Sequence, residues 1–233
     1  MFIEKLVQLY RKMKQLWSFA CINYPDTSNL GLYGKGAKIE YPVYFQTPST
    51  IFVEDFCQIR RGATIINSPN EKIIIKKYSL LSVNTTIVSQ NHVSTVGIPI
   101  VLLAPSHIND KFEDLIIEED VWLGANVTLI TGTKLGRGCI VAAGAVVNRN
   151  IPPYAVVAGV PARIIAVKFS KEQILKHEQI LYSEDERMKE SDINDLFSKY
   201  FDGKKVYGVQ SDLTMYSEKL NELQKDNIEI KYN

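Results

Sequence analysis

Three histidines could carry acid–base chemistry in this chain, because an imidazole titrates near neutral pH. His92 ends the stretch SVNTTIVSQNH and immediately precedes a long irregular segment, so it is well placed to serve as a general base. His107 lies inside that segment, in APSHIND, where it is either a loop residue or a helper. His177 lies among charged residues and is expected to be a solvated surface histidine.

Other catalytic chemistries find little support in the spacing of residues. Cys21, Cys57 and Cys139 are far apart and no two histidines lie within a few residues of each other, so no metal site is predicted. The chain has no G-x-S-x-G motif for a nucleophilic serine. The GRG at 136–138 has no βαβ surroundings and is interpreted as a turn, not as a dinucleotide loop.

The elements that must position these residues follow a repeat of six. From residue 117 the chain divides into IEEDVW, LGANVT, LITGTK, LGRGCI, VAAGAV and VNRNIP. An amphipathic helix or strand has a shorter period, whereas a three-sided parallel β-helix repeats every six residues and buries one continuous core. An aliphatic residue opens each hexad, and a small or β-branched residue stands four positions later: Ile117, Leu123, Leu129, Leu135, Val141 and Val147, then Val121, Val127, Thr133, Cys139, Ala145 and Ile151.

The repeat of six residues is also expected before residue 117, where it is interrupted. Glycines such as Gly124, Gly136 and Gly144 are expected at the turns between faces, where they adopt a positive φ. A segment from about 93 to 116 has no hexads, and an irregular insertion of that length is expected to be functional. Two earlier sets of residues keep the spacing of six: Ile39, Phe45, Ile51, Cys57 and Ala63, and Ile75, Leu81 and Ile87.

Helical segments are expected on both sides of the repeat. We assign 1–33 to an N-terminal helical segment, 34–168 to the β-helix and 169–233 to a C-terminal helical extension. Residues 1–20 have an apolar side flanked by Lys and Arg; packing on the end of the β-helix is favoured over contact with a membrane surface. Ser170 is a candidate N-cap for the helix that follows Lys168.

The composition excludes several classes of protein. The chain has 233 residues, 45% of them hydrophobic, and a formal net charge of +1. It is therefore neither a disordered chain nor a protein that binds nucleic acid through its charge. No apolar run approaches the ~20 residues of a transmembrane helix, and no signal peptide is visible. Three widely separated cysteines fit reduced thiols, so a cytoplasmic location is predicted.

The segment 116–165 resembles the hexapeptide-repeat acyltransferases, which have a left-handed parallel β-helix. The motifs DVWLGANV, AAGAVV and PPYAVVAGVPARII carry the resemblance, together with PVYF at 42–45 and NH at 91–92. Within that family the chain is similar to the galactoside, maltose and nodulation-type O-acetyltransferases and to relatives that modify polysaccharides. The resemblance covers about residues 34–168, and it implies a mainly β fold with flanking helices.

The resemblance also implies an activity and an assembly. Acetyl-CoA is the expected co-substrate, and the expected acceptor is a hydroxyl of a sugar or polysaccharide precursor. His92 matches the family's catalytic histidine, which deprotonates the acceptor for direct attack, without a metal or a covalent enzyme intermediate. The family forms homotrimers with active sites between adjacent copies, so a homotrimer is expected.

The family's cofactor-binding positions transfer to seven residues of this chain. Trp122 matches a tryptophan of the cleft wall, although filling a corner of the β-helix is the competing role. Small side chains at Ala125 and Ala143 would let the pantetheine arm approach the backbone. The polar and basic residues near the distal part of CoA would be Asn148, Arg149, Arg163 and Lys168, and any of these cations could equally be a solvated surface group.

The acceptor site departs from the family pattern. An acceptor-binding asparagine of the galactoside-type enzymes falls near Gly62 here, beside Arg60 and Arg61, which indicates that an anionic sugar could be the acceptor. Asn84 and Asn91 are further candidates for acceptor contacts. The insertion is longer than in the galactoside type, and a lid or a wall of the acceptor pocket is one role for it.

Several alternatives stay open. An antibiotic acetyltransferase or an N-acetyltransferase acting on an amino sugar would share His92 and differ in the acceptor pocket. A trimeric β-helix carbonic anhydrase needs three histidine ligands, two of them close in sequence, and this chain has no such pair. A trimerisation scaffold without activity would bind no CoA and would give His92 no role.

Overall fold

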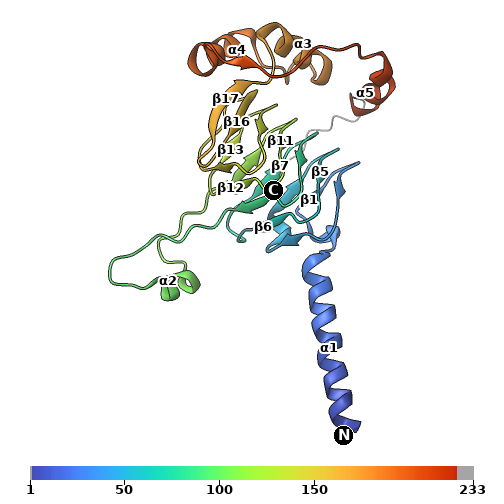
Figure 1. The fold of residues 1–233 in the computed structure, drawn as a ribbon, viewed down its shortest axis with the longest axis vertical. Coiled ribbons are helices and arrows are strands. Elements are labelled where there is room, and N and C mark those ends of the chain that lie inside the picture. Colours follow the sequence, from blue (N-terminus) through green and yellow to red (C-terminus); the bar gives the residue numbers. More distant parts are fainter. Residues whose placement is uncertain (1, 225–233) are drawn as a thin grey trace.

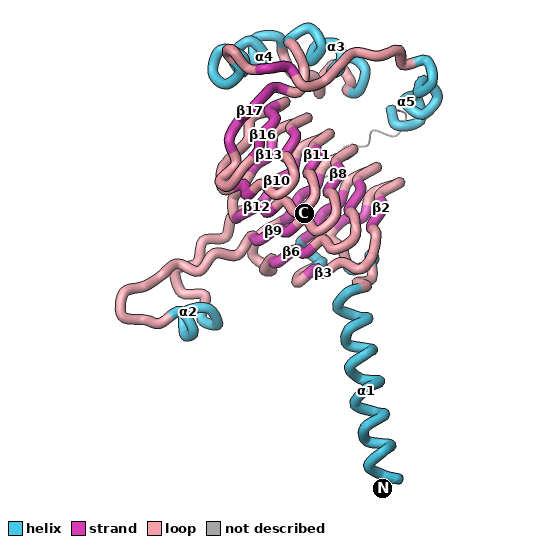
Figure 2. The backbone as a smooth tube through the Cα atoms, in the orientation of Figure 1, coloured by secondary structure: helices cyan, strands magenta, loops and turns pink. Residues whose placement is uncertain are grey.

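The computed structural model describes residues 2–224. Parallel strands stack into three sheets, and the chain passes from one sheet to the next at each turn, so that the sheets form the faces A, B and C of a prism (Figures 1 and 2). The expectation of a mainly β fold built from parallel strands, with helices at both ends, is confirmed. The left-handed sense of the winding stays a prediction.

Each face is a ladder of short strands. Face A contains β1 (Leu32–Tyr33), β4 (Ile51–Val53), β7 (Ile73–Ile75), β10 (Leu115–Ile117) and β13 (Lys134–Leu135). Face B contains β2 (Lys38–Ile39), β5 (Gln58–Ile59), β8 (Leu80–Leu81), β11 (Trp122–Leu123), β14 (Ile140–Val141), β16 (Ala155–Ala158), β17 (Arg163–Val167) and β18 (Lys205–Val206). Face C contains β3 (Tyr44–Phe45), β6 (Thr64–Ile66), β9 (Thr86–Val88), β12 (Thr128–Ile130) and β15 (Val146–Val147).

The core is the predicted ladder of aliphatic residues. All six residues that open the hexads from Ile117 to Val147 are fully buried, and the residues four positions after them are buried as well. Leu81, Leu123 and Val141 lie in register on face B, one above the other. Each such side chain contributes about 1.5–3 kcal/mol of burial energy, and stacking makes the contribution continuous along the prism.

The predicted phase is wrong between residues 51 and 63. The residue in register with Ile39 is Ile59, and the residue in register with Phe45 is Ile65, so each of these coils has 20 residues instead of 18. The extra residues form a 3-10 turn, Pro48–Thr50, at the corner after face C. Cys57 is buried, but it occupies the corner position two residues before the inward Ile59.

The turn glycines serve a different purpose from the one predicted. Only Gly144 of the three has a positive φ, whereas Asn126 adopts that conformation at the equivalent turn one coil earlier. At Gly124 a Cβ atom would stand 2.5 Å from the backbone nitrogen of Ala143, and at Gly136 it would stand 2.4 Å from that of Pro153. These two glycines are needed because successive coils touch there.

A long insertion leaves the prism between faces C and A. It spans 89–114, since Leu115 already pairs with Ile73 in face A; the predicted end at 116 is two residues too late. The insertion carries the short helix α2 (Ile100–Ser106) and extends sideways, away from its own prism (Figure 1). It is therefore not a lid over its own coils.

The N-terminal helix α1 (Phe2–Asn23) projects from the first coil (Figure 1). Every side chain from Lys5 to Ile22 is exposed, so the expected packing of this helix on the end of the prism is wrong. No helix within residues 2–224 combines the length and the apolar character needed to cross a bilayer.

The C-terminal extension covers the other end of the prism (Figure 2). It contains α3 (Lys171–Leu181), α4 (Glu190–Leu196) continued by a π-turn at Phe197–Phe201, and α5 (Ser217–Gln224). Ser170 caps α3 through a reciprocal capping box with Gln173, as predicted. The helix expected toward the C-terminus lies in part outside the described residues, since 225–233 are not among them.

Candidate active site

Two histidines share one carboxylate on the stem of the insertion. The Nδ1 atom of His92 and the Nδ1 atom of His107 each lie 2.9 Å from Oδ2 of Asp110. The backbone N–H of Val93 donates to the other carboxylate oxygen of Asp110 at 3.3 Å. The Asp110 side chain is 3% exposed, whereas His92 is half-buried and His107 is exposed.

Local backbone geometry brings His107 back toward His92. His107 ends α2 in the left-handed conformation, with φ of 51°, and its N–H bonds to the carbonyl of Leu103. Asn109 is also left-handed, so the chain turns sharply before Asp110. Desolvation opposes ionisation of Asp110, but hydrogen bonds from His107, His92 and Val93 outweigh it and hold its pKa below the ordinary value. An ionised carboxylate only accepts hydrogen bonds, so both histidines donate through Nδ1 and keep Nε2 as the basic nitrogen.

Asp110 is a candidate site residue that the sequence did not reveal. The expectation that the chain has no group of metal-ligating residues is also corrected. The fold brings together His92, His107 and Asp110, although His92 is distant from the other two in the sequence. The short interval from His107 to Asp110 in SHIND was the available signal, since three residues of turn can place two side chains together. Its relation to His92 depends on the path of the whole insertion.

A second group of predicted residues surrounds the corner between faces B and C. Asn84 stands at that corner in a left-handed turn, and its Nδ2 donates to Oδ1 of Asn126 one coil above, at 3.1 Å. Trp122 lies on face B with 42% of its surface exposed, and its Nε1 donates to Ser82 Oγ at 3.3 Å. Trp122 therefore points outward and does not fill a corner of the prism.

Small residues leave the backbone open at the same corner. Ala143 is exposed and Ala125 is half-buried. The carbonyl of Ala125 accepts a hydrogen bond from the N–H of Gly144 at 2.9 Å. A carbonyl oxygen has two lone pairs, so it can still accept a second donor from a ligand.

The predicted acceptor arginines lie at this corner too. Arg60 is held by Glu40 and by Oε1 of Gln58, the latter at 2.8 Å. Arg61 is exposed. Gly62 packs under Asn84, because a Cβ atom on it would stand 2.1 Å from Asn84 Oδ1. A side chain at position 62 would therefore require Asn84 to move.

The fold separates these residues from His92. Residues 60–63, 82–85, 124–127 and 142–145 connect face B to face C, whereas Asn91, His92, Asn148 and Arg149 follow strands of face C at the next corner. One face of the prism lies between the two groups. A single chain therefore does not bring His92 together with Trp122, Ala125 or Ala143.

The predicted cations differ in how available they are. Arg149 and Arg163 are exposed, as is Asn148. Lys168 is not a free surface cation, because its Nζ lies 2.5 Å from Asp120 Oδ2 and its side chain is largely buried. The prediction that Lys168 contributes charge to a phosphate site is not supported by this pairing.

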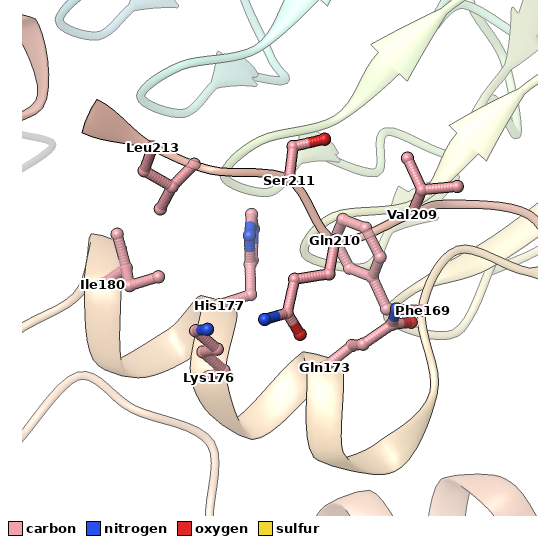
Figure 3. A pocket seen from close by; sticks show the side chains of 9 residues that line it. All are labelled: Phe169, Gln173, Lys176, His177, Ile180, Val209, Gln210, Ser211 and Leu213. Carbon is pink, nitrogen blue, oxygen red and sulfur yellow. The ribbon is translucent and has the colours of Figure 1, made fainter. Parts of the chain in front are cut away.

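His177 is not a solvated surface residue, contrary to expectation. Its Nε2 lies 3.1 Å from the same Asp120 oxygen, and its ring centroid lies 5.0 Å from that of Phe169. Figure 3 shows the ring rising from α3 toward the segment that carries Ser211 and Leu213. The cavity beside it, about 200 Å³, is smaller than the ~300–1,000 Å³ of typical small-molecule sites, and no residue of either prism corner lines it.

The three stacked sheets, with buried side chains at intervals of six, are the fold of a three-sided parallel β-helix. Residues 114–149 match the family model described as "Hexapeptide repeat of succinyl-transferase". The chain is 53% identical over 51 residues to a 2,3,4,5-tetrahydropyridine-2,6-dicarboxylate N-acetyltransferase of Staphylococcus aureus. That match covers 22% of this chain and 21% of the relative, so the chain matches about a fifth of the relative's length.

Solved structures share the fold. A hexapeptide-repeat-containing acetyltransferase from Vibrio cholerae superposes with a TM-score of 0.55 at 22% identity, covering 69% of this chain and 92% of that one. A galactoside acetyltransferase in complex with coenzyme A superposes with the same TM-score and identity, covering 76% of this chain and 87% of that one. The resemblance to hexapeptide-repeat acyltransferases seen in the sequence is thereby confirmed.

Proposed function

We propose that this protein is an acetyl-CoA-dependent acetyltransferase that acetylates a hydroxyl of a sugar or polysaccharide precursor, with His92 as the general base. The observation that carries the proposal is the hydrogen bond from His92 Nδ1 to the buried carboxylate of Asp110. It orients the ring and holds the tautomer in which Nε2 can take a proton. The fold shared with acetyltransferases supports the same conclusion.

The reaction follows from that arrangement. Acetyl-CoA supplies the acetyl group as a thioester. His92 Nε2 removes the proton of the acceptor hydroxyl, whose oxygen then bonds to the acetyl carbonyl carbon. As the carbon–sulfur bond breaks, His92 returns the proton to the departing thiolate. Asp110 stabilises the imidazolium that exists between these two transfers. The products are the acetyl ester and free CoA.

The corner between faces B and C is the proposed place for acetyl-CoA. Ala125 and Ala143 leave the backbone open there, and the exposed Trp122 offers an apolar wall. Arg163 of this copy and Arg149 from the corner of a neighbouring copy are the exposed cations proposed to pair with phosphate groups. One solved structure with this fold, at 22% identity, is of a Vibrio cholerae acetyltransferase complexed with acetyl-CoA.

A homotrimer would complete the site. His92 lies at a different corner of one prism from Trp122, Ala125 and Ala143, so a second copy is needed to bring them together. The insertion carries His92 outward and exposes apolar side chains that a neighbouring prism could cover. These side chains are Val96, Ile98, Ile100, Val101, Leu102, Ile108 and Phe112.

The acceptor is proposed to contact Asn84, Asn91 and Arg61, with Arg60 already engaged by Glu40. An amine acceptor is the second candidate, because the Staphylococcus aureus relative is an N-acetyltransferase. An amino sugar or an aminoglycoside-like antibiotic would be its chemical class. We assign the reaction to the cytoplasm, in keeping with three free cysteines, of which Cys57 and Cys139 are buried.

The test is release of free CoA from acetyl-CoA with a panel of sugars, sugar nucleotides, amino sugars and antibiotics. His92→Ala should lower kcat by ~10²–10⁴-fold, the usual contribution of a general base, and should still bind CoA in calorimetry. His177→Ala removes the histidine that pairs with Asp120 and should keep full turnover, because His177 lies outside both prism corners.

The outcomes separate the alternatives. Turnover with sugars alone supports O-acetylation, and turnover with amines alone supports the N-acetyl alternative. Undiminished turnover in His92→Ala would remove His92 as the base. A chain that binds no CoA at all would be a scaffold.

A further inference from the structure

Three potential metal ligands converge where the insertion leaves the prism. They are the imidazoles of His92 and His107 and the carboxylate of Asp110, and one ligand atom from each lies within 4.8 Å of the other two. The distance from the Nδ1 atom of each histidine to Asp110 Oδ2 is 2.9 Å. The two histidine rings have their centroids 5.6 Å apart and are tilted by 38°.

We propose that His92, His107 and Asp110 form a binding site for a divalent transition-metal ion such as Zn²⁺, and that the bound ion switches the active site off. Imidazole nitrogen and carboxylate oxygen are ordinary ligands of this ion, at about 2.0–2.2 Å. In a tetrahedral site with these bond lengths, neighbouring ligand atoms lie roughly 3.3 Å apart. The two imidazole rings would therefore have to move slightly closer together to bind the ion.

The burial of the three residues fits a site that takes up an ion from solvent. Asp110 is 3% exposed and held by the Val93 N–H, so it supplies a fixed anchor. His107 is exposed and belongs to the insertion, so it can move toward the ion. Three protein ligands leave a fourth position open to water.

Metal binding and base catalysis exclude one another at His92. Without a metal, Nδ1 carries the proton that is donated to Asp110, and Nε2 is basic. A metal on Nδ1 moves the ring proton to Nε2, because a neutral imidazole that ligates through one nitrogen is protonated on the other. His92 then has no nitrogen that can accept a proton from the acceptor. This inhibition rests on the proposed function, whereas the binding of the ion does not.

The experiment measures Zn²⁺ binding to the untagged full chain by competition with a chromogenic chelator. A Cys21→Ser background removes the exposed thiol, which could bind zinc by itself. We expect one Zn²⁺ per chain, with affinity reduced at least ~10-fold by His107→Ala and by Asp110→Asn, since loss of even an outer partner weakens a metal site by that factor. Cobalt(II) should give the visible spectrum of a nitrogen and oxygen ligand set.

His177→Ala is the matched control, because His177 also pairs with an aspartate but has no second histidine beside that aspartate within residues 2–224. Its zinc affinity should equal that of the parent. No binding at 100-fold molar excess of Zn²⁺ over chain, or binding equal in the parent and both ligand variants, overturns the inference. Thermal melting checks that His107→Ala is folded, as its exposed position implies.

Turnover separates this inference from the proposed function. If the enzyme acetylates, zinc should inhibit it and EDTA should restore it. The zinc concentration for half-inhibition of His107→Ala, relative to its own zinc-free rate, should rise at least ~10-fold. Zinc binding without acetyl transfer would leave the metal site standing and reject the proposed function. Acetyl transfer without zinc binding would support the proposed function and reject the metal site.

Discussion

The Nδ1 atom of His92 lies 2.9 Å from a carboxylate oxygen of Asp110, 18 positions later in the chain. The intervening residues leave the prism, form α2 and return. The base proposed for catalysis is thus held by the insertion itself and not by a strand of the prism. Changes in the insertion should therefore affect turnover directly.

Asp110→Asn tests this arrangement. The amide oxygen can still accept the Nδ1 proton, but it has no charge to stabilise the imidazolium, so kcat should fall by ~10²–10⁴-fold. The KM for acetyl-CoA should stay unchanged, because Asp110 does not lie at the corner proposed for CoA. Steady-state kinetics measure both values. A change in KM with an unchanged kcat would contradict the role of Asp110.

The exposed apolar surface of α2 predicts how the copies assemble. Val101 is 70% exposed and Leu102 is 62% exposed on this helix. We expect the double variant Val101→Asp, Leu102→Asp to sediment as a single 26.4-kDa chain, and the wild type at three times that mass. The variant should also lose turnover, because the proposed site is completed by a second copy.

Val209→Asp is the control for the assembly test, since Val209 is similarly exposed but lies in the C-terminal extension. It should sediment like the wild type. A trimer that survives both substitutions on α2 would show that the insertion does not form the interface.

A buried carboxylate joins the C-terminal extension to the prism. Glu178 on α3 is 1% exposed and accepts hydrogen bonds from Arg137 at 2.8 Å and from the Tyr154 hydroxyl at 2.5 Å. Tyr154→Phe should lower the free energy of unfolding by about 1.5–3 kcal/mol, the usual value of a hydrogen bond to a charged group. Urea unfolding measures the change.

Tyr182→Phe is the matched comparison. The Tyr182 hydroxyl is buried and has no hydrogen-bond partner within the described part of the chain. Its removal should leave the free energy of unfolding unchanged or raise it by about 1 kcal/mol, because an unpaired buried polar group is unfavourable. If Tyr154→Phe and Tyr182→Phe lower the free energy of unfolding equally, the hydrogen bond from Tyr154 to Glu178 does not stabilise the fold as predicted.

Glu54 predicts a pH dependence of stability. Burial raises the pKa of this carboxyl from 4.5 to about 7, with a smaller contribution from the charge of Glu119, although the Lys77 N–H opposes the shift. The folded chain therefore binds more protons than the unfolded chain between these two values. Stability should fall as pH rises through this window, and the loss should be complete above pH 7.

Glu54→Gln removes that loss and keeps an oxygen for the Lys77 N–H. At pH 8 the variant should be more stable than the wild type by at most ~3–4 kcal/mol, and the difference should shrink toward pH 4.5. Chemical unfolding at several pH values measures it. Glu40→Gln is the control, because Glu40 is exposed: its stability should depend on pH as that of the wild type does. If Glu54→Gln and the wild type also show the same dependence of stability on pH, the role of Glu54 is rejected.

The repeat could be predicted from the sequence because its physical cause is local. Each coil stacks on a nearly identical coil, so inward positions such as Leu123, Leu129 and Leu135 recur at a fixed interval wherever the coil has 18 residues. The prediction went wrong at Ile51, Cys57 and Ala63, where corner residues were added. These three residues are still buried, but a turn of two extra residues puts Val53, Ile59 and Ile65 in register with the predicted positions of the next coil in their place, and local spacing does not reveal such a turn.

The site depended on contacts between distant segments. His92 was found from its place at the edge of the insertion, but Asp110 becomes its partner only when the chain returns beside it. Lys168 was expected near CoA and His177 was expected at the solvated surface, but in the fold both pair with Asp120. Charge, apolar period and turn residues act within a few positions, so the sequence by itself determined the repeating β fold and indicated the chemistry that we propose. Which polar side chains pair, and which corners His92 and Trp122 occupy, was decided by tertiary structure, because those contacts join residues that only folding brings together.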